Sequence, residues 1–112
     1  MSIQFSISQH DKVSVISMNG RILSELDLDS IKQALENTSA QNFVFDLSNL
    51  THTNSSGIAF IIRIMTRARI SGGDVVLANP NPGIQKLIDI SKLYEVFSIY
   101  ATKEEAINHF NQ

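Results

Sequence analysis

The residues best suited to chemistry lie in the turn Asn54-Ser55-Ser56-Gly57, between a short apolar run and a long amphipathic segment. Either serine could cap the first turn of a helix. A serine there could also carry a phosphate, because the helix dipole and the unpaired N–H groups of a first turn favour an anion. Gly57 lets the backbone or a bulky partner come close. The turn is therefore either a simple helix cap or a modification site.

Other chemistry has little support in the sequence. The three histidines, His10, His52 and His109, lie in different predicted elements without a second ligand at metal spacing, which favours surface or structural roles. Asp46 is a lone carboxylate at a strand end, which is typical of a turn-forming residue rather than a base. The sequence contains no cysteine and no phosphate-binding glycine loop of standard spacing. We therefore expect no enzyme activity, no catalytic residue, no metal and no cofactor.

The composition is that of one globular domain spanning residues 1–112. The apolar fraction is 43%, the charged fraction 18% and the net charge −2, which argues against disorder and against direct binding of nucleic acid or an anionic membrane. No apolar run is long enough to span a bilayer, and Met1-Ser2-Ile3-Gln4 does not begin a signal peptide. We expect a cytoplasmic protein without membrane insertion.

The elements that position the serine turn follow from the apolar periodicity. The run 43–47 reads as a strand buried on both faces, and a helix follows whose core stripe is predicted to be Ile58, Ile61, Ile62, Met65 and Ala68. Gly72-Gly73 would end this helix. On its predicted outer face lie Phe60, Arg63 and Arg67, and an aromatic among arginines is a favoured interface composition. These three residues and the serine turn form the predicted partner surface.

The rest of the chain supplies a sheet and further helices. Residues 3–18 read as a hairpin turning at His10-Asp11-Lys12, while the stretch from Arg21 to Leu26 is ambiguous. Helices are predicted after Asp27, after an Asn81 cap with Pro82 at the first position, and after the capping-box segment 102–105. Strands are predicted at 75–78 and 96–99. The order ββαβαβαβα predicts an α/β domain with a mixed, largely parallel sheet.

The segment 45–58, Phe-Asp-Leu-Ser-Asn-Leu-Thr-His-Thr-Asn-Ser-Ser-Gly-Ile, resembles the STAS family, specifically the anti-sigma factor antagonists. Members of this family commonly show an apolar strand ending in Asp-Leu-Ser, a polar turn, and Asp-Ser-Ser-Gly-Leu or Asp-Ser-Thr-Gly-Leu opening a helix. The resemblance extends to Asn19-Gly20, Gly72–Leu77, Ile84–Ile88, Leu93–Phe97 and Glu104–Ala106. It therefore covers nearly the whole chain and implies the STAS fold.

The resemblance also implies a partner switch that regulates transcription. In such systems the unphosphorylated antagonist binds an anti-sigma factor that is also a serine kinase, and the sigma factor is released. Phosphorylation of the first serine of the motif, which falls on Ser55, ends that binding, and a serine phosphatase restores it. The partners implied are thus the anti-sigma factor/serine protein kinase and the phosphatase.

Three positions depart from the family pattern. The acidic residue normally before the phosphorylated serine is Asn54, the acidic residue that often follows the glycine after the second strand is absent from 21–24, and Lys92 stands where a glycine is usual. The two carboxylates are associated in the family with phosphorylation and kinase docking. A second reading therefore remains open, in which the chain is a non-phosphorylated STAS subunit of a transport or signalling assembly.

Overall fold

The computed structural model describes residues 3–36 and 38–111. The chain opens with an antiparallel hairpin, in which β1 (Gln4–His10) pairs with β2 (Val13–Arg21) from Gln4↔Asn19 to His10↔Val13. Asp11 in the connecting turn adopts φ 59°, a conformation that short hairpin turns require. The predicted hairpin is confirmed, and its second strand runs on to Arg21 because Gly20 (φ 104°) bends the chain without ending the strand.

The sheet is mixed and largely parallel, as the sequence predicts. Its order is β1-β2-β3-β5-β6, and β3 (Asn42–Asp46), β5 (Asp74–Ala78) and β6 (Ile99–Tyr100) add in parallel beyond β2. A further strand, β4 (Leu50–His52), pairs in parallel with the last residues of β2, beyond the point where β3 stops. β4 is not predicted from the sequence, because its three residues lie within a polar stretch.

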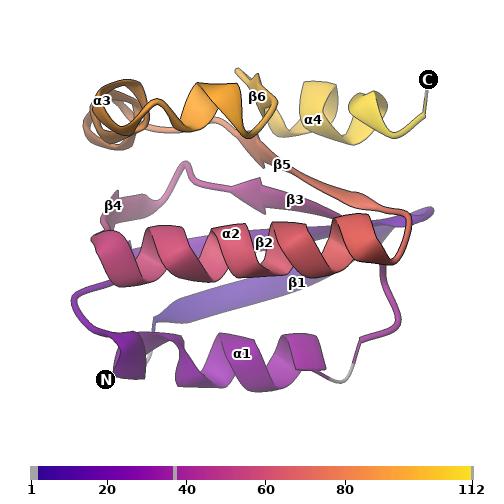
Figure 1. The fold of residues 1–112 in the computed structure, drawn as a ribbon, viewed down its shortest axis with the longest axis horizontal. Helices are drawn as coiled ribbons and strands as arrows, with labels where there is room; N and C mark the ends of the chain where they lie inside the picture. Colours follow the sequence, from indigo (N-terminus) through magenta and orange to yellow (C-terminus); the bar gives the residue numbers. More distant parts are fainter. Residues whose placement is uncertain (1–2, 37, 112) are drawn as a thin grey trace.

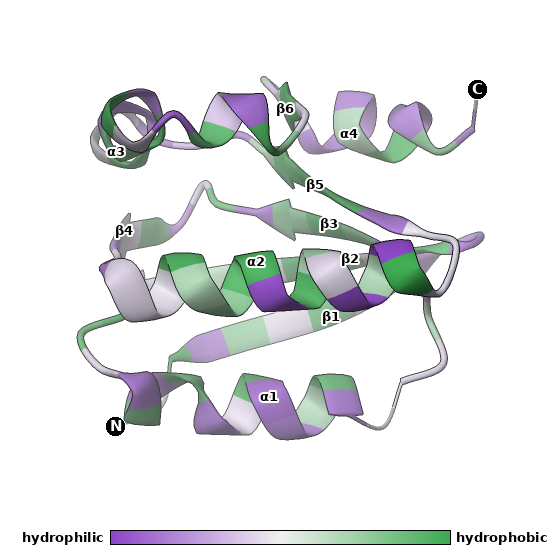
Figure 2. Cartoon of the chain, viewed as in Figure 1, coloured by the Kyte–Doolittle hydropathy of each residue, from purple (hydrophilic) through white to green (hydrophobic). Residues whose placement is uncertain are grey.

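Period-two alternation along the central strands builds a core on each face. Phe43, Phe45 and Leu77 face the larger core, which α1 (Asp29–Glu36), α2 (Ser55–Ile70) and α3 (Pro82–Ser91) cover. Figure 1 shows α1 and α2 lying side by side. Val44 and Val76 face the smaller core, which α4 (Lys103–His109) covers with Ala106. Figure 2 shows β3 and β5 as mostly hydrophobic. β3 is thus buried on both faces, as predicted, although it spans Asn42–Asp46 rather than 43–47.

Local signals place the ends of several helices correctly. The Asn81 side chain accepts a hydrogen bond from the Ile84 N–H, with Pro82 opening α3, and Thr102 accepts from the Glu105 N–H at the start of α4. The 3₁₀ helix η1 (Glu25–Leu28) precedes α1.

Within residues 3–36 and 38–111 no helix is long and apolar enough to cross a membrane.

The segment after α3 differs from the prediction. Residues Val96 and Phe97 do not belong to the last strand, because a 3₁₀ helix η2 (Leu93–Glu95) turns the chain and β6 contains only two residues. Lys92, between α3 and η2, adopts the left-handed conformation with φ 58° and ψ 32°. The turn that usually contains glycine is therefore kept, with a lysine in the conformation that glycine favours.

The core face of α2 is rotated from the predicted one. The buried stripe consists of Gly57, Phe60, Ile61, Ile64, Met65 and Ala68, whereas Ile58 and Ile62 are only half-buried. Phe60 is 2% exposed, and its ring meets that of Phe45 edge-on at a centroid distance of 6.2 Å. The prediction that Phe60 lies on the outer face is therefore wrong, since the side chain fills the core above β3.

Candidate functional site

The turn before α2 is built around the side chain of Asn54. Its Oδ1 accepts hydrogen bonds from the Ser56 N–H at 3.0 Å and the Gly57 N–H at 3.2 Å, and its backbone carbonyl accepts from Ile58. Asn54 is in extended conformation, as a residue preceding a helix should be. The prediction that Ser55 or Ser56 caps the helix is therefore wrong: the preceding asparagine is the N-cap.

Ser55 is the first residue of α2 and its side chain is exposed, whereas Ser56 is half-buried. The Asn54 side chain already occupies two N–H groups of the first turn, so a phosphate on Ser55 would not find those groups free. The dipole at the start of α2 would still favour its charge. A phosphate would thus project from the surface without requiring the helix to unfold.

The loop after β2 forms the second wall of the site. Nδ2 of Asn54 donates a hydrogen bond to the carbonyl oxygen of Leu23 at 2.8 Å, so the residue that caps α2 also holds this loop. The Leu23 side chain is 60% exposed beside the serine turn. Sequence reasoning missed Leu23, because a contact 31 positions away leaves no periodic signal.

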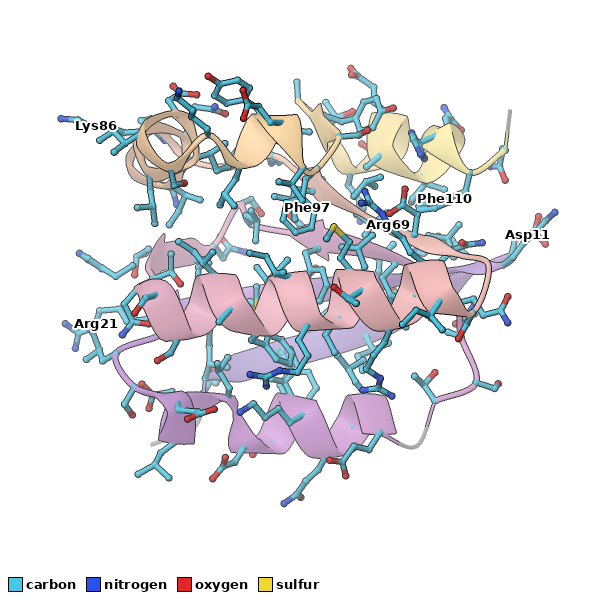
Figure 3. All side chains as sticks on the ribbon, viewed as in Figure 1. Asp11, Arg21, Arg69, Lys86, Phe97 and Phe110 are labelled. Carbon is cyan, nitrogen blue, oxygen red and sulfur yellow. The ribbon has the colours of Figure 1, made fainter. Side chains whose placement is uncertain are left out.

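Arg21 adds positive charge at the same end of the molecule. In the register of β2 and β4, Arg21 lies opposite His52. Figure 3 shows Arg21 at the end of the molecule where α2 begins, far from Asp11 in the hairpin turn. Arg21, Leu23, Ser24 and Thr51 line an open groove of about 610 Å³ beside the turn. Asp27 also lines this groove, and the hydrogen bond that it accepts from the Leu23 N–H holds the pKa of its carboxyl group below the ordinary value.

Gly57 is buried and faces the protein rather than a partner. A Cβ atom at this position would overlap Thr53 Oγ1 and would lie 3.2 Å from Ile22 Cδ1. Thr53 Oγ1 is itself buried without a hydrogen-bond partner among the described residues. The close approach predicted at Gly57 is therefore real, but the neighbours are Ile22 and Thr53 of the same chain.

The predicted partner residues on α2 do not form one surface. Phe60 is in the core, whereas Arg63 and Arg67 are exposed. At 1.5 Å per residue, Arg63 lies about 12 Å and Arg67 about 18 Å from Ser55 along the helix axis. Lys32 donates a hydrogen bond to the carboxylate of Glu25 in η1 and lowers its pKa. Arg63 is close enough to Glu25 to add a smaller lowering.

The remaining candidates have local structural contacts. The carboxylate of Asp46 accepts hydrogen bonds from the Ser48 N–H and the Ser17 hydroxyl, which agrees with the predicted turn-forming role. Nδ1 of His109 bonds the Tyr100 hydroxyl at 2.6 Å, His52 contacts Thr51, and His10 contacts Ser8. In the described part of the chain, no three His, Cys, Asp or Glu side chains gather where they could hold a metal ion.

Comparison with known proteins agrees with this architecture. The family model of the STAS domain matches residues 4–106. An anti-sigma F factor antagonist from Paenibacillus polymyxa is 24% identical over 96% of this chain and 94% of its own length, and one from Lysinibacillus sphaericus is 28% identical over 79% and 80%.

Solved structures share the fold. The anti-sigma factor antagonist SpoIIAA in its unphosphorylated form superposes with a TM-score of 0.80 at 22% identity, covering 96% of both chains. The phosphorylated form of the Bacillus SpoIIAA superposes with a TM-score of 0.69, covering 96% of this chain and 99% of the other. At this identity the structures establish the fold alone. The family model, which matches more than half of the chain, shows that this chain belongs to the STAS domain family.

Proposed function

We propose that this protein is an anti-sigma factor antagonist that binds an anti-sigma factor/serine protein kinase and is switched off by phosphorylation of Ser55. The observation that carries the proposal is the placement of Ser55: an exposed hydroxyl at the first residue of α2, in the family's serine motif. The relatives named as anti-sigma F factor antagonists support the same role.

The partner surface that we propose is centred on Asn54, Ser55 and Ser56 and includes the exposed Leu23 side chain, with Arg21 and Arg63 at its rim. Leu23 takes the place of Phe60 as the apolar contact, because Asn54 fixes its backbone directly beside the serine turn. A partner that fits this surface would offer an apolar recess bordered by acidic side chains. Gly57 acts from beneath, by letting α2 pack on Ile22 and Thr53.

Phosphorylation would act on the partner rather than on the fold. A phosphate adds about 1.5 to 2 negative charges, and here it would stand on the surface that the partner must cover. The acidic rim inferred for the partner would then face a like charge across a desolvated contact. In this scheme a serine phosphatase acts on the exposed phosphate and restores binding.

The test measures binding of the cognate kinase by calorimetry to the wild type, Ser55→Ala and Ser55→Asp. We expect Ser55→Ala to bind like the wild type and Ser55→Asp to bind at least about tenfold more weakly, a loss of roughly 1.4 kcal/mol. Circular dichroism should show that all three proteins are folded. Mass spectrometry of the wild-type protein isolated from its own cells should find phosphate on Ser55. Equal affinities, with no phosphate in cells, would instead support the non-phosphorylated assembly subunit. Leu23→Ala would test the apolar contact separately.

A further inference from the structure

A cleft of about 230 Å³ opens at the end of the molecule opposite Ser55. It lies where α1 and α2 end, between them and the connection that leads into β3. Its floor includes Leu35, Phe43 and Ile64, which are nearly fully buried, and its rim includes Ser39 and Ser71. The cleft is thus separate from the proposed partner surface.

Arg67 gives the cleft its charge. Its exposed side chain lines the cleft, and within residues 3–36 and 38–111 no hydrogen bond or ion pair engages its guanidinium. The other arginines of α2 differ: Arg69 bonds Asp74 and the Val96 carbonyl, and Arg63 lies close to Glu25. Among the described residues that line the cleft none is acidic, so none of them competes for the guanidinium of Arg67.

The polar rim limits what the cleft can hold. Hydroxyl groups of Ser39 and Ser71 and the amide of Gln41 offer both donors and acceptors, while Thr38 Oγ1 accepts from the Ala40 N–H and holds the loop. A guanidinium binds a carboxylate through two parallel hydrogen bonds. The volume of 230 Å³ is roughly eight times the volume that one water molecule occupies in the liquid, which limits the ligand to a small molecule.

We propose that this cleft binds a small hydroxylated carboxylic acid, with its carboxylate on Arg67 and its hydroxyl groups on the serine and glutamine side chains. The site is independent of the partner switch at Ser55. The carbonyl ends of α1 and α2 face this end of the molecule and disfavour negative charge, which Arg67 must offset. They suit hydroxyl donors, so the ligand should carry a single negative charge.

Amide chemical shifts measured during titration with glycerate test the proposal, with ionic strength held constant by sodium chloride. We expect saturable shifts confined to residues 38–41 and 67–71, and binding at least tenfold weaker in Arg67→Gln. The matched control Arg63→Gln lies one turn away on the same exposed face and should bind like the wild type. Both substitutions are on the surface and should leave the fold intact.

Two further probes decide the class of ligand. Glycerol lacks the carboxylate and benzoate lacks the hydroxyl groups, so both should bind more weakly than glycerate. Shifts that do not saturate, that sodium chloride alone reproduces, or that persist unchanged in Arg67→Gln would overturn the proposal. Tighter binding of benzoate than of glycerate would overturn the hydroxylated class. None of these outcomes depends on whether Ser55 is phosphorylated.

Discussion

The side-chain amide of Asn54 donates to the carbonyl oxygen of Leu23 at 2.8 Å while its Oδ1 accepts from two N–H groups at the start of α2. An amide can do both, whereas an ionised carboxylate has no donor. Asn54 therefore joins the loop after β2 to the helix that carries Ser55. The acidic residue usual at this position in the family could cap the helix but could not hold Leu23 in this way.

Replacing Asn54 with aspartate should loosen that loop. Asn54→Asp places a negative charge against the Leu23 carbonyl, whereas the helix dipole offsets part of the loss by about 0.3–1 kcal/mol. We expect faster amide hydrogen exchange at residues 21–24 with little change in the exchange of the α2 core. Asn54→Ser is the matched control. Serine also caps a helix and also lacks the amide that holds Leu23, but it adds no negative charge, so the difference between the two variants measures the effect of the charge. Unchanged exchange in both variants would show that the Leu23 bond does not hold the loop.

Asn54→Asp should also increase the rate at which a kinase phosphorylates Ser55. A carboxylate next to Ser55 can orient the attacking hydroxyl or accept its proton, whereas an amide can only hydrogen-bond. We expect a kinase to modify Ser55 faster in Asn54→Asp than in the wild type, measured as initial rates by mass spectrometry. Asn54→Ser should not show the increase. Equal rates in the wild type and Asn54→Asp would mean that a negative charge at position 54 has no effect on the phosphorylation of Ser55.

Truncating Phe60 should destabilise the fold strongly. The side chain is buried against Phe45, and Phe→Ala in a packed core costs about 3–5 kcal/mol. Urea unfolding monitored by circular dichroism should show this loss for Phe60→Ala. Arg63→Ala, on the exposed face of the same helix, should stay within about 0.5 kcal/mol of the wild type. A small effect of Phe60→Ala would contradict the position of its ring.

Adding a methyl group at Gly57 should also destabilise the protein, although alanine is normally the better helix residue by about 1 kcal/mol. The new Cβ would overlap Thr53 Oγ1, and overpacking of this kind costs about 1–3 kcal/mol. The double variant Gly57→Ala/Thr53→Ala should recover much of the loss, because it removes the overlapping atom. Gly83→Ala is the control in α3, where the nearest atom is 3.5 Å away. Equal effects at Gly57 and Gly83 would refute the overlap.

Lys92 offers a stabilising change. A left-handed residue with a side chain costs roughly 1–2 kcal/mol, and glycine removes this cost while losing some entropy on folding. Lys92→Gly should therefore raise the free energy of unfolding by about 0.5–1 kcal/mol, which is the conformational cost removed less the roughly 0.5–1 kcal/mol of extra entropy that a glycine loses on folding. Lys92→Ala should not, since alanine keeps the Cβ atom. Both values come from thermal and urea unfolding; a gain in Lys92→Ala would point to charge rather than conformation.

The sequence alone determined those parts of the protein whose signals are local. Alternation of apolar residues identified the hairpin and the buried strand containing Phe43 and Phe45, and single capping residues such as Asn81 and Thr102 located the starts of α3 and α4. An N-cap is a hydrogen bond between residues two or three apart, so the local sequence predicted the caps of α3 and α4. At α2 it predicted a serine cap, whereas the cap is the adjacent Asn54. The motif around Ser55 could be identified from the sequence because its residues are contiguous.

Tertiary structure decided which residues surround Ser55. Between Ile58 and Met65 apolar residues occur on nearly every side of α2, so periodicity could not tell which side meets the sheet; contact with Phe45 turns Phe60 inward. Likewise, β4 exists because β2 extends beyond β3 and offers it a partner. The bond from Asn54 to Leu23 joins two segments that only the sheet brings together. Such contacts depend on packing between distant residues, and the order of the chain does not record them.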